Sequence, residues 1–122
     1  MHDRVWKKGY NGEIILGNTH LDKKRARSEE WQYRFPSLPL DIVDFLGEKK
    51  VKLIGIDILG IKAADHNAFL MHIGPEKFGI TFIKDIANLD KLIEGKPYLT
   101  AALPPKFRGA NGLMRRVAAM KL

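Results

Sequence analysis

Two residues twelve positions apart, His72 and Lys84, raise the main chemical question in this sequence. A histidine at one end of a short segment and a carboxylate at the other would be typical of a metal site, because imidazole and carboxylate are ligands for zinc and related ions. Lys84 instead carries an ammonium group, which has no lone pair while protonated and repels a cation. The pair therefore predicts no metal here unless other ligands come from elsewhere.

The other reactive side chains give no stronger signal. The chain has four histidines, His2, His20, His66 and His72. The last two are six residues apart, which is not the spacing that forms a helical chelate. Serine occurs only at positions 28 and 37, without the turn that presents a nucleophile. Lys84 is a conceivable Schiff-base lysine if burial lowers its pKa, but a buried structural lysine paired with Asp57 or Asp85 is the interpretation we favour.

Basic residues outnumber acidic ones, and the formal net charge is +7. The densest basic cluster consists of Lys23, Lys24, Arg25 and Arg27. Such a cluster makes nucleic acid a candidate partner. No aromatic residue is interleaved with it as a stacking platform would require. We therefore expect a solvated basic loop that binds nucleic acid weakly at most.

The composition predicts one domain, 1–122, with one hydrophobic core, because 45% of the 122 residues are hydrophobic. Cysteine is absent, which excludes disulfides and thiolate metal sites. No apolar run approaches the roughly 20 residues that span a bilayer. The first ten residues lack the apolar stretch of a secretory signal. The expectation is a cytoplasmic protein without a membrane partner.

Apolar runs bounded by turn residues predict five strands. They are expected at 13–16, 51–56, 79–83, 98–103 and 113–120. Residues 38–46 show apolar positions at helical spacing, with Ser37 as a possible cap and Gly47 as a left-handed ending. Shorter helical segments are expected at 65–72 and 88–92, and a loop at 17–35. Strands that alternate with helices predict an α/β fold with a mixed, partly parallel sheet.

Several motifs follow one another in a fixed order. They are VKLIGIDILGIK at 51–62, His72, GITFIKDIANLDKL at 79–92 and TAALPPKFRGANGLMRRVAAM at 100–120. This set resembles the cyclase family, which includes the kynurenine formamidases and isatin hydrolases. Gly12–Leu16 and Phe35–Leu38 extend the resemblance upstream. It covers nearly all of this chain but only the C-terminal half of the family.

The resemblance implies a partial swivelling β/β/α fold and a divalent metal that polarises an amide and activates water. The family's main ligand motif, His-x-Gly-Thr-His-x-Asp-x-Pro-x-His, lies in the half that this chain does not match. His72 keeps the family's second-half histidine, but the glutamate twelve residues later is Lys84, and a usual aspartate is Lys62. We therefore expect no cofactor, with zinc or manganese bound only if a partner supplies ligands.

One local string, Thr19-His20-Leu21-Asp22, reproduces the Thr-His-x-Asp core of that motif. The motif's other four positions do not match, and the register of the whole chain places the string elsewhere. We interpret it as a coincidence, which leaves His20 and Asp22 as the weakest metal candidates. His72 itself is better explained as a polar side chain at a helix end or interface than as a ligand.

These observations favour a non-catalytic, half-length relative of the family that acts as an oligomeric assembly or regulatory subunit. Uncovered sheet edges and apolar faces would then need a homo-oligomer or a complementary chain. One alternative is half of a split metal-dependent amide hydrolase that a partner chain completes. Another is a basic nucleic-acid-binding module. If the chain is an enzyme, the resemblance implies hydrolysis of cyclic or acyl amides.

Overall fold

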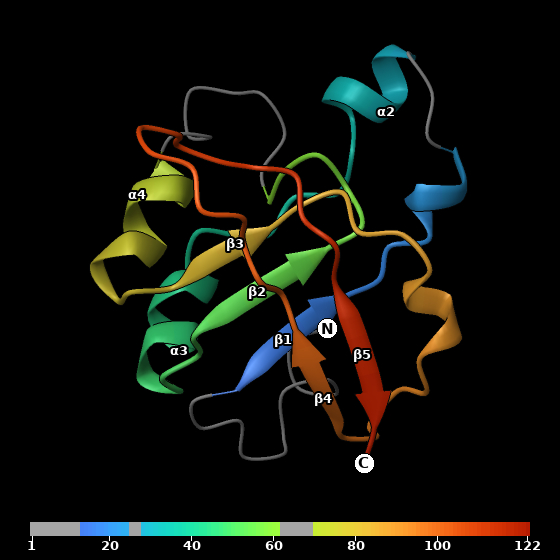
Figure 1. The fold of residues 1–122 in the computed structure, drawn as a ribbon. Helices are drawn as coiled ribbons and strands as arrows, with labels where there is room; N and C mark the ends of the chain where they lie inside the picture. The colour runs from blue at the N-terminus through green and yellow to red at the C-terminus, as the bar shows by residue number, and fades with distance from the viewer. Residues whose placement is uncertain (1–12, 25–27, 62–69) are drawn as a thin grey trace. The chain divides into compact units, whose positions relative to one another are not determined.

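The computed structural model describes residues 13–24, 28–61 and 70–122. The chain divides into two compact units, an N-terminal unit, Met1–Asp90, and a C-terminal unit, Lys91–Leu122. The expected α/β class is confirmed, because the N-terminal unit holds a parallel sheet with helices and the C-terminal unit an antiparallel pair of strands (Figure 1). Within the described ranges no helix is both long enough and apolar enough to span a bilayer.

The N-terminal unit is built on a three-stranded parallel sheet in the order β1-β2-β3 (Figure 1). The strands are β1, Ile14–Gly17, β2, Leu53–Ile56, and β3, Thr81–Ile83. Ile15 lies opposite Ile54, and Ile54 lies opposite Phe82. Since all three strands run the same way, the segments that follow them meet at one edge of the sheet, the carboxyl edge.

The helical elements of the chain are short. They are η1, Leu21–Lys24, α2, Glu29–Tyr33, α3, Ile42–Glu48, α4, Leu70–Lys77, and η2, Leu89–Lys91. Two of them, η1 and α2, lie in the segment 17–35, where a loop was predicted. The start of α2 is fixed locally, because the Trp31 N–H donates to Ser28 Oγ at 3.2 Å, which is the geometry of a helix cap.

Helix α3 differs from the prediction at both ends. Its N-cap is Asp41 rather than Ser37, and the Asp41 side chain makes no capping hydrogen bond. Gly47 lies within the helix, and the left-handed residue that follows the helix is Lys50, with φ 53°. A Cβ at Gly47 would lie 2.5 Å from the Phe78 ring. The glycine is therefore explained by the close approach of Phe78 and not by a turn.

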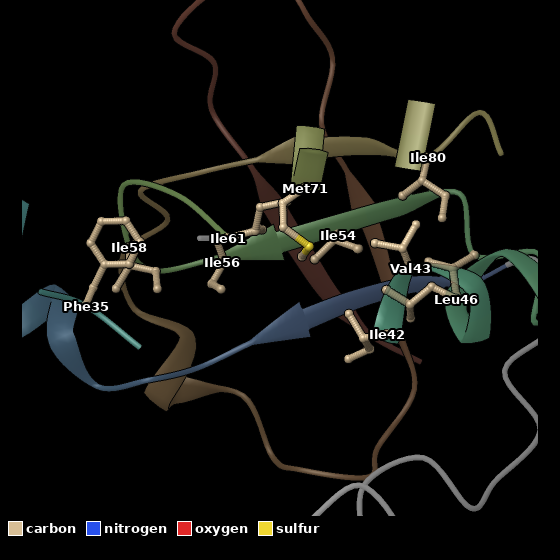
Figure 2. Close-up of a cluster of buried hydrophobic side chains, with 11 residues drawn as sticks. Phe35, Ile42, Val43, Leu46, Ile54, Ile56, Ile58, Ile61, Met71 and Ile80 are labelled. Atoms are coloured by element: carbon tan, nitrogen blue, oxygen red, sulfur yellow. The ribbon is translucent and has the colours of Figure 1, made fainter. Parts of the chain in front are cut away.

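The hydrophobic core lies where α3 and α4 pack on one face of the sheet. Its buried members are Phe35, Ile42, Val43, Leu46, Val51, Ile54, Ile56, Ile58, Ile61, Met71 and Ile80. Figure 2 shows Met71 of α4, Val43 of α3 and Ile54 of β2 directed toward one another. Ile54 and Ile56 share this face because side chains alternate along a strand. The core thereby fixes α4, whose first turn lies at the carboxyl edge.

The C-terminal unit contains one antiparallel ribbon. Strand β4, Tyr98–Ala101, pairs with β5, Ala118–Lys121, through a long connection. The Arg115 Nη1 donates to the Ala102 carbonyl oxygen at 3.1 Å and joins the two arms of that connection. None of the residues from 91 to 122 is buried. The unit therefore has no apolar core of its own.

Candidate functional site

The candidate site is the carboxyl edge of the parallel sheet. Ligands of open α/β sheets bind outside the carboxyl ends of the strands, where the connecting segments converge. Here the converging segments are Thr19–Asp22 after β1, Asp57 after β2, and Lys84–Asn88 after β3. Every polar residue to which the sequence assigned a possible metal or charge-pairing role lies in these segments or in the first turn of α4.

The backbone at this edge is unusually constrained. His20, Asp85 and Asn88 adopt the left-handed region, with φ values of 63°, 61° and 65°. His, Asp and Asn enter this region more readily than other non-glycine residues, but it still costs conformational energy. Such conformations cluster at functional sites, where the surrounding structure holds them in place. Three of the four non-glycine residues with positive φ among the described residues therefore lie at this edge.

Asp57 is the buried centre of the edge, with none of its surface exposed. The Thr19 N–H donates to both carboxylate oxygens, at 2.9 Å to Oδ1 and 3.0 Å to Oδ2, and the Thr19 hydroxyl donates to Oδ1 at 2.9 Å. A buried carboxylate needs such donors to offset its loss of water. These bonds join the ends of β1 and β2, so Asp57 has a structural role.

Lys84 was expected to pair with Asp57 or Asp85. The hydrogen bonds of the Asp57 carboxylate described above all come from Thr19. Asp85 is placed by its backbone, whose N–H donates to the Ile58 carbonyl oxygen at 3.0 Å. The pairing of Lys84 with a carboxylate stays a prediction.

Two contacts tie the segment after β1 to the segment after β3. The Asn88 N–H donates to Asp22 Oδ2 at 3.2 Å, and Lys23 Nζ lies 2.8 Å from Asp90 Oδ2. The hydrogen bond that Lys23 donates to Asp90, and then the negative charge of Asp90, raise the pKa of Lys23. Sequence reasoning missed both contacts, because 66 residues separate Asp22 from Asn88. The signal that could have suggested them is the rule that all strands of a parallel sheet end at the same edge.

His72 and Lys84 lie within electrostatic reach of each other. Burial, and then the positive charge of Lys84, lower the pKa of His72 from 6.5. Burial also lowers the pKa of Lys84 from 10.5, although part of this side chain remains exposed. The His72 ring meets Phe82 edge to face, with ring centroids 6.2 Å apart and planes at 83°. Both shifts favour the uncharged form of the side chain concerned.

This donor set does not fit a divalent metal. The imidazole supplies one ligand, and the ammonium beside it supplies none while protonated. Asp22 Oδ1 is buried and lacks a hydrogen-bond partner among the described residues. Even so, no three His, Cys, Asp or Glu side chains in that part of the chain form a group that could hold a metal ion. We therefore derive no metal-dependent step for these residues.

The remaining candidates from the sequence are not brought into one site. The His20 side chain is exposed, and its backbone N–H donates to Asn18 Oδ1 at 3.0 Å. Lys23 is paired with Asp90 as described above, and Lys24 is exposed. Other residues named in the sequence analysis, namely His2, Arg25, Arg27, Lys62 and His66, lie outside the described residues.

The pair makes a testable statement about proton binding. We expect a proton NMR titration to give His72 a pKa below 6.5, and Lys84→Met to raise that pKa only part of the way, since burial is the larger cause. Because folding lowers this pKa, the unfolded chain binds the proton more tightly, and stability should fall as pH decreases below 6.5. The exposed Lys77 of α4 supplies the control, and Lys77→Met should leave the titration unchanged. An equal effect of both substitutions would contradict this account.

Comparisons with known proteins agree with this geometry. No family model matches the chain. The kynurenine formamidase of Bacillus mycoides is 29% identical over 110 residues, which are 83% of this chain and 52% of that protein. The kynurenine formamidase of Bacillus cereus is 33% identical over 87 residues, 71% of this chain and 41% of that protein.

A solved structure points the same way. It is described as a potential metal-dependent hydrolase with cyclase activity, and it superposes with a TM-score of 0.75 at 26% identity. The match covers 89% of this chain and 51% of that chain. The chain therefore spans about half the length of the relatives it matches. Together with the ordered motifs, these matches place the chain in the cyclase family that includes the kynurenine formamidases.

Proposed function

We propose that this chain is a non-catalytic member of the family that serves as an assembly or regulatory subunit. The observation that supports this most directly is the ammonium group of Lys84 beside the imidazole of His72. Family chemistry depends on a metal that imidazoles and carboxylates hold. An amine in place of a carboxylate at one ligand position removes a negative charge from the site and, while protonated, opposes binding of that metal.

The carboxyl edge supports this proposal in a second way. Thr19, Asp57, Asp22 and Asn88 use their polar groups to hold the three strand ends together. The Asp57 carboxylate and Asp22 Oδ2 are thus used in bonds within the chain, while Asp22 Oδ1 lacks a partner among the described residues. The edge therefore serves to hold the fold together, as expected of a subunit that keeps the family fold without the catalytic activity.

The test is metal content. We expect protein that has been incubated with zinc or manganese and desalted to retain far less than one ion per chain by elemental analysis. Lys84→Glu should not restore stoichiometric binding, because one histidine and one glutamate make a poor site. One tightly held ion per wild-type chain, lost in His72→Ala, would refute the proposal.

A second candidate is half of a split amide hydrolase, and two observations favour it. His72 lies at the edge where the sheet would present a ligand, and the chain matches about half of each relative. The two candidates differ when this chain is mixed with the unmatched part of the Bacillus mycoides kynurenine formamidase. A non-catalytic subunit gives no metal-dependent formamide hydrolysis, whereas a split enzyme gives hydrolysis that His72→Ala abolishes.

A further inference from the structure

The C-terminal unit carries almost all of the net charge of the chain. Its basic residues are Lys91, Lys96, Lys106, Arg108, Arg115, Arg116 and Lys121. Its acidic side chain is Glu94, which leaves a formal charge of +6 out of the total of +7. The other 90 residues are close to balance, with 14 basic and 13 acidic side chains. The net positive charge of the chain is therefore concentrated in its last 32 residues.

The same unit exposes large apolar side chains. Leu99 and Met120 lie directly opposite each other on β4 and β5, so they share one face of the ribbon, and both are exposed. The connection between the strands adds Leu103 and Met114, which are 81% and 96% exposed, together with the exposed Phe107. Exposed apolar side chains gathered in one small unit typically mark an interaction surface.

The ribbon also lacks what a stable sheet needs. A two-stranded ribbon alone is marginally stable in water, and three strands or a packed face are usually required. Among the described residues the second sheet consists of β4 and β5, which pair with each other. The outer edge of each strand is therefore unpaired in that sheet. A partner strand laid along either edge would satisfy the backbone groups there and cover the apolar face.

The residue types favour a protein partner over a nucleic acid. Protein interfaces are enriched in Met, aromatic residues and Arg, and depleted of Lys, Glu, Asp, Ser and Ala. The unit exposes Met114, Met120 and Phe107 and contains neither Asp nor Ser, although it also has four lysines and five alanines. Single-stranded nucleic acid is instead bound by aromatic stacking platforms, whereas most of the exposed apolar side chains here are aliphatic.

From these observations we propose that the C-terminal unit docks onto an acidic, apolar-centred surface of a different protein chain. A second copy fits poorly, because a symmetric contact would place +6 against +6, and the rest of the chain offers no net negative charge. The proposal rests on the assembly role inferred above and names its partner class. The docking surface is tested by peptide binding without metal, whereas the non-catalytic role is tested by metal content. Failure of one inference can therefore be distinguished from failure of the other.

The experiment uses the full chain and a defined probe. The probe is a short fluorescent peptide of alternating leucine and glutamate, and the matched control peptide alternates leucine and lysine. Anisotropy is measured at moderate salt, about 150 mM, so that weak surface attraction is screened. We expect the acidic peptide to bind at least about tenfold more tightly than the basic one, because both can add a strand but the positive unit attracts only the acidic peptide.

Three variants divide the effect between charge and apolar area. The charge variant combines Lys106→Gln, Arg108→Gln and Arg116→Gln, and the apolar variant combines Leu99→Thr and Met120→Thr. A matched control removes three exposed lysines of the N-terminal unit through Lys24→Gln, Lys52→Gln and Lys77→Gln. We expect each of the first two variants to weaken peptide binding about tenfold, and the control to change it less than about twofold. Circular dichroism confirms that each variant is folded.

Several results would overturn the proposal. If the acidic peptide did not bind, or if the control variant lost as much peptide affinity as the charge and apolar variants, the C-terminal unit would not be the binding surface. Tighter binding of a thymidine oligonucleotide or of phosphatidylserine vesicles at the same salt would identify nucleic acid or membrane as the partner. A dimer in sedimentation at micromolar concentration that Met120→Thr dissociates would identify a second copy.

Discussion

Asp57→Ala should lower the free energy of unfolding by about 3 kcal/mol, a large fraction of the roughly 5 to 15 kcal/mol of a small domain. The substitution removes a fully buried carboxylate and leaves the N–H and hydroxyl of Thr19 without their acceptor. Urea denaturation followed by circular dichroism measures the change. We expect the midpoint to fall with little change in the denaturant slope.

The partner of Asp57 provides the graded control. Thr19→Val removes the hydroxyl bond but keeps the N–H that donates to the carboxylate, so it should cost less, about 1 kcal/mol. Part of that cost comes from Leu21, whose N–H donates to Thr19 Oγ1 at 3.3 Å. If Asp57→Ala were no worse than Thr19→Val, the buried carboxylate would not be what joins β1 to β2.

Met71→Ala should have a comparable effect, about 3 kcal/mol, because it removes a large side chain that is 1% exposed and leaves a cavity between α4, α3 and β2. The adjacent Leu70 provides the matched control. Its side chain is 52% exposed, so Leu70→Ala should change stability by about 0.5 kcal/mol or less. The same urea denaturation measures both variants.

The Met71 variant also has a readout at the site. Met71 anchors the turn of α4 that carries His72, so loosening this turn should expose the imidazole and raise its pKa toward 6.5. Leu70→Ala should leave that pKa unchanged. A destabilised Met71→Ala protein whose His72 titrates as in the wild type would show that α4 is held to the sheet by other contacts.

The sheet was predictable to the extent that its strands are apolar runs. The run from Val51 to Ile56 predicted β2, whose neighbours on both sides are parallel strands. The helix before it was predicted from its apolar stripe, because Ile42, Val43 and Leu46 do face the core. Periodicity succeeded wherever burial repeats regularly along the chain.

The sequence prediction failed where the structure depends on a local polar cap or on a contact between residues far apart in the sequence. Helix α2 has no apolar stripe and starts at the Ser28 cap, which a pattern search over residues 17–35 does not detect. Gly47 was interpreted through the usual left-handed role of glycine, whereas its reason is the Phe78 ring that packs against it. That contact depends on a residue 31 positions later in the sequence and becomes visible only in the fold.

The candidate site was predictable only in part. The resemblance placed His72 and Lys84 at the positions of the family's second-half histidine and glutamate. The structure brings the two side chains within electrostatic reach of each other. The resemblance gave no sign that Thr19 would donate to Asp57, since 38 residues separate them. Such bonds are properties of converging strand ends, and no spacing along the chain encodes them directly.

The parallel order of β1, β2 and β3 has a consequence for the synthesis of the chain. Ile15 pairs opposite Ile54, so β1 leaves the ribosome 39 residues before its partner exists. At about 5 to 20 residues per second, this apolar strand waits roughly 2 to 8 seconds, and the central strand waits again for β3. In a sheet built of hairpins the partner strand follows within a few residues, so the delay would be much shorter. The nascent chain is therefore most prone to aggregation early in translation, when β1 is still unpaired.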